Sequence, residues 1–271
     1  MKKERVDVLA FQQGLFETRE QAKRGIMAGT VYTQKNQRLD KPGEKLPQDT
    51  ILKLIGEPLP YVSRGGLKLE KALEVFDFHV KNKILLDIGA STGGFTDCAL
   101  QNGAKLSYAL DVGYNQLAWK IRQDPRVVVM ERRNFRYCKP EDFTKGKPEV
   151  ATIDVSFISL KKILPALHPI LTNQGNVMAL IKPQFEAGKN SVGKKGIIHD
   201  PVVHQEVLED IIHFALQENY NLQALNYSPV TGGGGNIEFI AHFEKTDQSG
   251  NDHSNINLRQ LVAKAHNNLD K

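Results

Sequence analysis

From residue 84 onward the chain alternates short apolar runs with longer amphipathic segments, and this pattern constrains its fold more than any other feature. Runs rich in Val, Ile and Leu predict buried strands. They are ILLDIG (84–89), KLSYALDV (105–112), RVVVME (126–131), EVATIDVS (149–156), GNVMALIKP (175–183), NLQALNYSPV (221–230) and NIEFIAHFEK (236–245). Repeated strand-helix units predict an α/β fold with a doubly wound, mostly parallel sheet, and the last two strands, which follow each other directly, predict an antiparallel edge.

Helices are predicted where apolar residues recur every three or four positions. These segments are 63–76, 93–103, 115–123, 159–171 and 200–220. Pro165 predicts a bend or an end in the fourth of them, because proline cannot continue the hydrogen bonds of a helix interior. Pro201 falls near the first turn of the last one, where proline is tolerated.

The length of 271 residues suits one large domain and a small one. Two prolines in the segment 57–61 favour an extended linker, so we expect a small domain over 1–60 and a large one over 61–245. The remainder, 246–271, is a polar tail with at most a short helix near 258–265.

No apolar run is long enough to span a membrane, and the N-terminus lacks the pattern of a signal peptide, so we expect a cytoplasmic protein. Two cysteines, Cys98 and Cys138, are too few for a disulfide framework or a structural zinc site. His199, His204 and His213 do not have the spacing of metal ligands either, and we predict no metal.

The first 60 residues carry 11 basic and 8 acidic side chains, a higher density of positive charge than the rest of the chain. Helices are expected over 4–16 and 18–29, with Thr18 as an N-cap and Gly14 and Gly29 as terminators. On the second helix Ala22 and Ile26 face away from a basic face. That face is formed by Arg19, Lys23 and Arg24.

Strands are expected over 30–34 and 49–55, with polar turns between them. A small α+β appendage with a solvated charged face explains these features as well as nucleic-acid binding does. The order RVDVLAFQQGLFETREQAKRGIMAGTVYTQ followed by PGEKLPQDTILKL, however, resembles the ribosomal-protein S-four-like RNA-binding domain. The resemblance implies contact with structured RNA through its phosphates.

A glycine-rich turn after the first predicted strand suits a ligand, because glycines let the backbone approach closely and a helix begins there. Dinucleotide binding, S-adenosylmethionine binding and plain tight turning are all compatible with it. The spacing lacks the dinucleotide and triphosphate fingerprints, which favours S-adenosylmethionine. The candidate cofactor residues are Asp87, Gly89, Ala90, Ser91, Thr92, Gly93, Gly94 and Phe95, with Asp111 for ribose hydroxyls and Asn134 either near the adenine or as a loop cap.

Charged residues also end two otherwise apolar strands, Asp154 after the fourth and Lys182 after the fifth. Parallel sheets bind ligands at this edge, and an unpaired buried charge is costly. Separate ion pairs at the rim of the sheet are the alternative explanation for each residue alone.

Several motifs occur together in the order of one known family: SRGGLKLEKAL, DIGASTGGFTD, IDVSFISL, IKPQFEAG and GGGGNIEF. The chain resembles the TlyA, or hemolysin A, family of S-adenosylmethionine-dependent ribosomal RNA 2′-O-methyltransferases. This implies a Rossmann-like class I methyltransferase fold whose catalytic domain is similar to FtsJ-type enzymes, with S-adenosylmethionine as cofactor and ribosomal RNA or ribosomal subunits as partner. The Lys-Asp-Lys-Glu tetrad of that type matches Lys68, Asp154, Lys182 and Glu238.

In our hypothesis Lys182 deprotonates or hydrogen-bonds the ribose 2′-hydroxyl as it attacks the methyl group in line. Burial and the like charge of Lys68 are expected to lower the pKa of Lys182, Asp154 to orient it, and Glu238 to position Lys68 or the ribose. Further RNA contacts are expected from basic side chains near the site. They are Arg64, Lys189, Lys194 and Lys195, with Arg132, Arg133 and Arg136 as a second candidate patch.

Three other functions remain as alternatives at this level. A membrane-damaging haemolysin, as the family name suggests, finds little support without a spanning segment or a long cationic amphipathic helix. An RNA- or ribosome-binding protein without catalysis does not account for the tetrad. A methyltransferase acting on a small molecule does not account for the basic N-terminal segment.

Overall fold

A computed structural model of the chain describes residues 2–16, 18–27, 29–55, 59–188, 193 and 196–269, and the side chain of Arg24 is outside the description. The chain divides into two compact units, Met1–Gly66 and Leu67–Lys271. Most of the linker predicted over 57–61 is described, except for Glu57 and Pro58.

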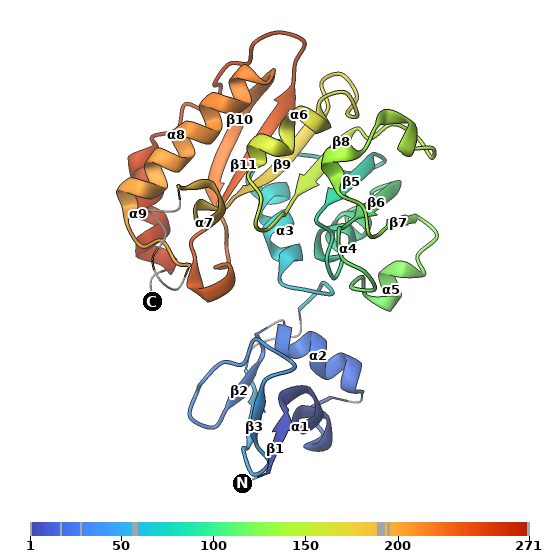
Figure 1. The fold of residues 1–271 in the computed structure, drawn as a ribbon, viewed down its shortest axis with the longest axis vertical. Coiled ribbons are helices and arrows are strands. Elements are labelled where there is room, and N and C mark those ends of the chain that lie inside the picture. The colour runs from blue at the N-terminus through green and yellow to red at the C-terminus, as the bar shows by residue number, and fades with distance from the viewer. Residues whose placement is uncertain are drawn as a thin grey trace. The chain divides into compact units, whose positions relative to one another are not determined.

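The first unit is a small α+β arrangement of two helices and two pairs of short strands (Figure 1). Its elements are β1 (Lys3–Arg5), α1 (Val6–Gln12), α2 (Arg19–Met27), β2 (Val31–Thr33), β3 (Lys45–Pro47) and β4 (Leu52–Leu54). Strand β1 pairs with β3, and β2 pairs with β4, both antiparallel. The helix expected over 4–16 was too long at both ends, because residues 4 and 5 belong to β1 and pair with β3 and because α1 ends at Gln12.

The interior of this unit is apolar and draws on both helices. Ala22 and Ile26 are fully buried, which confirms the apolar face expected of α2. Thr18 is the N-cap of α2, as expected: its hydroxyl accepts from the backbone N–H of Gln21 at 3.1 Å, and the Gln21 side chain accepts from the Thr18 N–H at 3.1 Å.

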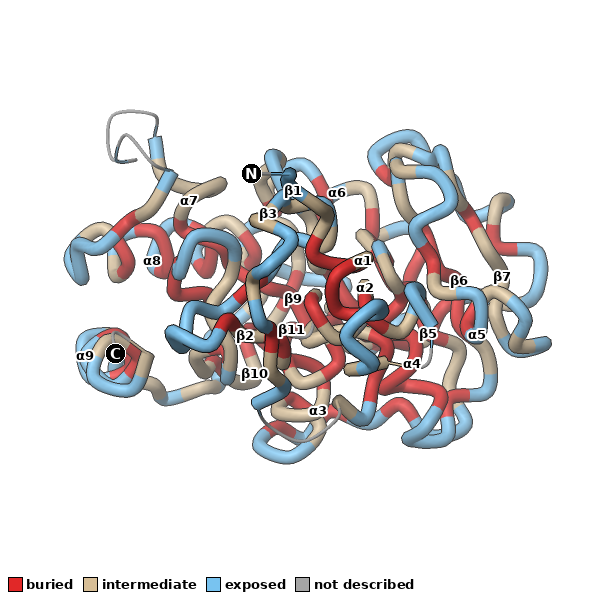
Figure 2. The backbone as a smooth tube through the Cα atoms, turned by 90° about the horizontal axis from the view of Figure 1, so that it is seen from below, coloured by how far each residue is buried: buried red, intermediate tan, exposed pale blue. Residues whose placement is uncertain are grey.

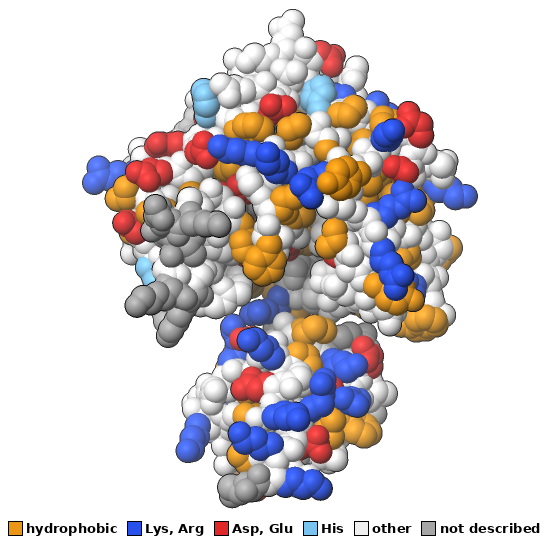
Figure 3. Space-filling model, viewed as in Figure 1, with side chains coloured by type: hydrophobic (Ala, Val, Ile, Leu, Met, Phe, Trp, Pro, Cys, Tyr) orange, Lys and Arg blue, Asp and Glu red, His pale blue; other side chains and the backbone are white. Residues whose placement is uncertain are grey.

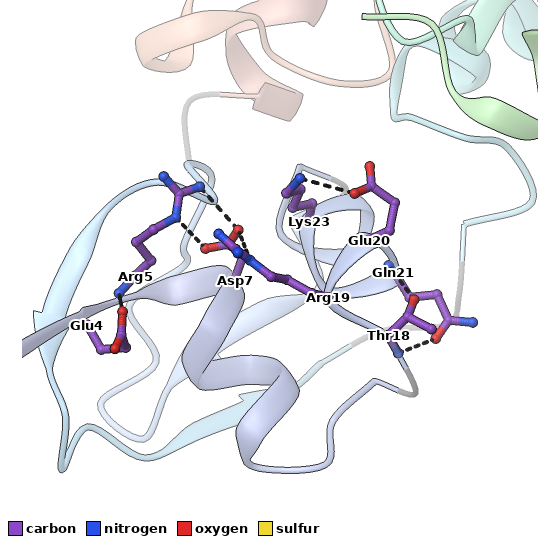
Figure 4. A network of polar contacts seen from close by, with 8 residues as sticks. All are labelled: Glu4, Arg5, Asp7, Thr18, Arg19, Glu20, Gln21 and Lys23. Carbon is purple, nitrogen blue, oxygen red and sulfur yellow. Dashed lines mark hydrogen bonds and ion pairs between the residues drawn. The ribbon is translucent and has the colours of Figure 1, made fainter.

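One buried carboxylate joins the starts of the two helices (Figure 4). Asp7 is fully buried and accepts from the Arg5 Nε at 2.8 Å and from the Arg19 Nε at 3.0 Å. Burial alone would raise the pKa of Asp7, but the hydrogen bonds and charges of the two arginines outweigh it and lower the pKa. Arg19 therefore has a structural partner within its own unit.

The second unit is built on a seven-stranded sheet in the order β10-β11-β9-β8-β5-β6-β7. Its strands are β5 (Ile84–Ile88), β6 (Leu106–Leu110), β7 (Val127–Met130), β8 (Val150–Ile153), β9 (Asn176–Ile181), β10 (Tyr220–Tyr227) and β11 (Phe239–Lys245). Only β11 runs against its neighbours, since it pairs antiparallel with both β9 and β10, while the pairs from β9 to β7 are parallel. The mostly parallel, Rossmann-like sheet and the antiparallel pair at its end are thus confirmed. Strand β11 lies between β9 and the edge strand β10.

Helices cover both faces of this sheet, α6, α7 and α8 on one and α3 and α4 on the other (Figures 1 and 2). The helices are α3 (Gly65–Val75), α4 (Gly94–Gln101), α5 (Trp119–Arg122), α6 (Leu164–Leu167), α7 (Pro183–Glu186), α8 (Pro201–Gln217) and α9 (Leu258–Leu269), with the 3₁₀ turns η1 (Phe135–Tyr137), η2 (Pro140–Asp142), η3 (Leu160–Lys162) and η5 (Gly233–Gly235). The expected helix over 159–171 is two short pieces, η3 and α6. Its break falls at Ile163 and not at Pro165, because proline sits in the first turn of α6, where no N–H is needed.

The C-terminal segment belongs to the second unit. Helix α9 packs against α8 and β10 and buries Leu261, Val262 and Ala265 in the main core. The short helix expected near residues 258–265 is confirmed and extends to Leu269. Among the described residues, no helix is both long and apolar enough to cross a membrane.

Candidate active site

The strand order changes direction at β5, whose neighbours are β6 and β8, and open α/β sheets bind ligands at the carboxyl edge of such a point. The residues that follow the strands meet there. Gly89 follows β5, Asp111 follows β6, Asp154 follows β8 and Lys182 follows β9. The sheet therefore brings the glycine turn and two of the expected tetrad residues to one edge.

All four residues of the expected tetrad form one connected network. Lys68 on α3 donates to Glu238 Oε2 at 2.7 Å and lies 3.5 Å from Asp154 Oδ2. Lys182 donates to the other oxygen of Asp154. Lys68, Lys182 and Glu238 are buried, whereas the Asp154 side chain is 22% exposed. These contacts join the four residues into a single cluster of alternating charge, so they are not separate ion pairs.

The charges in this cluster fix the ionisation of two members. Burial alone would lower the pKa of Lys68, but the nearby charges of Asp154 and Glu238 raise it above its ordinary value. Burial alone would raise the pKa of Asp154, but the charges of Lys68 and Lys182 lower it. Lys68 is therefore held as an ammonium and Asp154 as a carboxylate.

Two glycines let the backbone close around the cluster. A Cβ on Gly89, whose φ is +88°, would lie 2.2 Å from the carbonyl oxygen of Asp154. A Cβ on Gly232 would lie 2.0 Å from Glu238 Oε1. Position 89 therefore requires glycine, because the contact is with backbone and φ is positive, whereas a side chain at position 232 would have to displace the Glu238 carboxylate.

The structure places the Asp87 carboxylate inside the sheet. It is fully buried and accepts from the Thr96 hydroxyl at 2.7 Å, the Thr96 N–H at 3.1 Å and the Thr152 hydroxyl at 3.0 Å. Burial raises the pKa of Asp87 to about 7. Asp87 thus anchors the start of α4 beneath the glycine turn through three hydrogen bonds, and its expected contact with the cofactor stays a prediction.

Within the turn itself, side-chain access differs among the expected residues. Ala90, Gly93, Gly94 and Phe95 are buried, whereas Ser91 is exposed and Gly89 and Thr92 are partly exposed. The Ser91 N–H donates to Asp111 Oδ2 at 2.8 Å. In this turn the exposed residues and the backbone can therefore contact a ligand, whereas the buried side chains maintain the conformation of the turn.

Asp111 is positioned by two backbone donors and stays partly exposed. The second donor is the Gly113 N–H, at 2.7 Å from Oδ1. Beside it Val112 is 69% exposed, an apolar side chain that the sequence analysis did not select. The sequence feature that could have identified Val112 is its position directly after Asp111, the carboxylate that follows a strand. Asn134 caps η1 through a hydrogen bond from the Arg136 N–H at 3.2 Å, which is the loop-cap alternative.

Phe157 is a second residue that the sequence analysis missed. Its side chain is 90% exposed, and its φ of +62° is unfavourable for a residue with a Cβ. Its ring lies 4.9 Å from the ring of Phe185, which in turn lies 5.9 Å from Lys182 Nζ. An exposed aromatic ring is thus held beside the lysine of the cluster. Only its place three residues after Asp154 hinted at this.

The expected RNA-contacting side chains are only partly brought together. In the first unit Arg19 binds Asp7, Lys23 pairs with Glu20 at 3.0 Å and Arg64 lies 3.7 Å from Asp40. Lys and Arg side chains are nevertheless numerous on the face of this smaller unit seen in Figure 3. Lys189, Lys194, Lys195 and the side chain of Arg24 lie outside the described residues.

Arginine and aromatic side chains meet on the loops that follow β6 and β7. The Arg132 guanidinium lies 4.0 Å from the centre of the Tyr114 ring, and that of Arg136 lies 5.3 Å from the centre of the Tyr137 ring. Both tyrosines are largely exposed. The second candidate patch therefore combines cations with stacking surfaces, whereas Arg133 pairs with Asp142 at 2.8 Å.

Comparison with known proteins agrees with this geometry. A model of the FtsJ-like methyltransferase family matches residues 61–245. The chain belongs to the FtsJ-like methyltransferase family. The match spans the whole tetrad and the glycine turn, so the family resemblance inferred from these motifs is confirmed.

The relatives of this FtsJ-like methyltransferase extend over its first unit as well. YqxC of Bacillus subtilis, named as a candidate rRNA methyltransferase, is 62% identical over 270 residues, 99% of this chain and 96% of that protein. The 16S/23S rRNA (cytidine-2′-O)-methyltransferase TlyA of Mycobacterium tuberculosis is 40% identical over 87% of this chain and 88% of its own. A solved structure of a candidate hemolysin from Streptococcus thermophilus is 59% identical, covers 100% of this chain and 98% of its own, and has a TM-score of 0.80.

Proposed function

We propose that the protein transfers the methyl group of S-adenosylmethionine to a ribose 2′-hydroxyl of ribosomal RNA. The observation that carries this proposal is the connected cluster of Lys68, Asp154, Lys182 and Glu238 at the carboxyl edge of a methyltransferase sheet. The name of the Mycobacterium tuberculosis relative, a cytidine-2′-O-methyltransferase of ribosomal RNA, supports the substrate.

The residues around the glycine turn fit this cofactor. Asp111 has a partly exposed carboxylate that suits ribose hydroxyls, and the exposed Val112 offers an apolar surface for the adenine. The turn at Gly89 passes directly beside Asp154, which supports a cofactor bound next to the tetrad. When bound, the cofactor supplies an electrophilic methyl group.

Within the tetrad we assign the contact with the 2′-hydroxyl to Lys182. Asp154 orients the Lys182 amine, and Ser156 Oγ lies 3.5 Å from the same nitrogen. Lys68 is the positioning residue, because its raised pKa keeps it protonated between Asp154 and Glu238. Lys182 then aligns the hydroxyl for in-line attack, by a hydrogen bond or by accepting its proton, and much of the rate comes from this alignment.

We assign two further RNA contacts from exposure and charge. The exposed ring of Phe157 is placed to stack on the base of the target nucleotide, since stacking on an aromatic ring is a common way to hold an unpaired base. The first unit, with its resemblance to the ribosomal-protein S-four-like domain, is assigned to bind RNA phosphates. Removing residues 1–60 should weaken RNA binding and its salt dependence while leaving cofactor binding nearly unchanged.

The test is transfer of a labelled methyl group to purified ribosomal subunits, followed by nucleoside analysis of the extracted RNA. Label recovered as a 2′-O-methylated nucleoside supports the proposal. Label in a base, or in a small molecule added to the reaction, would place the chemistry elsewhere. Cofactor binding with no transfer to either subunit would favour a binding protein without catalysis.

A further inference from the structure

A groove next to the tetrad has no role in the chemistry described so far. It lies between α3, the end of β10 and the start of α9, and encloses about 420 Å³. Its polar lining consists of Lys71, Asn226, Tyr227, Asn257, Gln260 and Lys264. That volume falls within the range of pockets that hold a nucleotide-sized group.

The groove is positively charged. Two lysines line it, and none of the lining residues, all of which the structure describes, carries a carboxylate. None of the ion pairs within the described part of the chain involves Lys71 or Lys264. Such a lining favours an anionic ligand, because the two lysines are stabilised by a negative charge and no residue of the lining supplies one.

Lys71 is held in place for such a contact. Its Nζ donates to the carbonyl oxygen of Tyr227 at 2.8 Å and lies 3.8 Å from the centre of the Tyr227 ring. Burial lowers the pKa of Lys71, and no charged neighbour opposes this effect. The carbonyl takes one of its three N–H directions and the ring covers another, which leaves one for a ligand.

The groove adjoins the tetrad through two elements. Lys71 comes three residues after Lys68 on α3, which corresponds to a rise of about 4.5 Å along the helix and a similar direction around it. Tyr227 precedes Ser228, whose N–H donates to the carbonyl oxygen of Glu238 at 2.8 Å. A strand of RNA with its target ribose at Lys182 therefore has a cationic groove beside it.

We propose that this groove binds a phosphodiester of the substrate RNA next to the target nucleotide, held by Lys71 and Lys264. This inference rests on the proposed function, since it names how the same site receives its RNA. The amide side chains of Asn226 and Gln260 are then available to the adjoining sugar or base. Such a contact positions the strand without reading its sequence.

The experiment compares Lys71→Gln, Lys264→Gln and the double variant with Lys105→Gln, a change at an exposed lysine just before β6, in the half of the sheet that lies farther from β10. RNA binding is measured by filter retention over a range of salt concentrations, independently of methyl transfer. We expect about a tenfold loss of affinity in the double variant, and a slope of log affinity against log salt that is smaller by about one for each lysine removed. Lys105→Gln should leave both unchanged, and cofactor affinity should be unchanged throughout.

Equal RNA affinity and equal salt slope in the double variant and the control would overturn the inference. Lys264 is exposed, so Lys264→Gln gives a reading even if Lys71→Gln unfolds the protein. Inorganic phosphate at 10 mM distinguishes the source of the anion, because this concentration is roughly a hundredfold above a dissociation constant of about 0.1 mM. A thermal shift with phosphate that the double variant loses, while its RNA binding stays normal, would assign the groove to free phosphate and contradict the RNA contact. A wild-type protein that binds RNA normally but transfers no methyl would refute the proposed function alone.

Discussion

The pair Lys68–Glu238 gives the most specific prediction about what holds the tetrad together. Their side chains are 10% and 2% exposed, and Lys68 Nζ lies 2.7 Å from Glu238 Oε2. Lys68→Met leaves the buried Glu238 carboxylate without its cation, and breaking a buried pair from one side costs about 3–5 kcal/mol. Glu238→Gln costs less, about 1–3 kcal/mol, because Lys68 keeps Asp154 at 3.5 Å.

In the double variant the uncompensated buried charge at position 238 is gone. The sum of the two single destabilisations should therefore exceed the destabilisation of the double variant by about 1–2 kcal/mol. The assay is urea unfolding followed by circular dichroism, read on the transition of the second unit. A destabilisation below about 1 kcal/mol for Lys68→Met, or single effects that add within about 0.5 kcal/mol, would refute the buried pair as described.

Three further predictions test the parts around the tetrad. Gly89→Ala should destabilise the second unit by about 3 kcal/mol and weaken cofactor binding, because its Cβ would meet the carbonyl oxygen of Asp154 and its φ is +88°. Gly188→Ala, whose Cβ would have no atom within 4 Å, serves as the control in the same unfolding and binding assays. Asp87→Asn should change the pH dependence of stability: with a pKa of about 7 in the fold against an ordinary 3.8, wild-type stability falls as the pH rises from about 4 to 7, by up to about 4 kcal/mol, and the variant should lack this slope in urea titrations. Phe157→Ala should raise KM for RNA or lower kcat about tenfold without changing cofactor affinity, and Phe157→Tyr should keep the wild-type activity. Full activity of the alanine variant would exclude a stacking role.

The fold of the second unit could be predicted because its strands are encoded by local composition. Apolar runs such as 84–88 and 176–181 are long enough to identify buried parallel strands without tertiary information. The position of β11 between β9 and β10 could not be predicted, because strand order depends on packing between distant segments. Strands β1 and β3 have three residues each and little apolar character, so their sequence gave no period to detect.

The tetrad could be located from sequence by the strand-ending Asp154 and Lys182 and by the family resemblance. Its contacts could not, because Lys68 and Glu238 are 170 residues apart and meet only through the packing of α3 against the sheet. The hydrogen bonds of Asp87 could not be predicted for a related reason. A carboxylate beside a glycine turn looks available to a ligand in sequence, and only the hydrogen bonds from Thr96 and Thr152 show that it points inward.

Methyl transfer by Lys182→Ala tests the central claim most directly. Wild type and variant are compared in single-turnover transfer of labelled methyl to ribosomal subunits, with cofactor affinity measured in parallel by equilibrium dialysis. The account predicts unchanged cofactor affinity and a loss of about 10²-fold or more in the rate of ribose methylation. Transfer at the wild-type rate by a variant that binds the cofactor normally would contradict the assignment of Lys182 and, with it, the role of the tetrad.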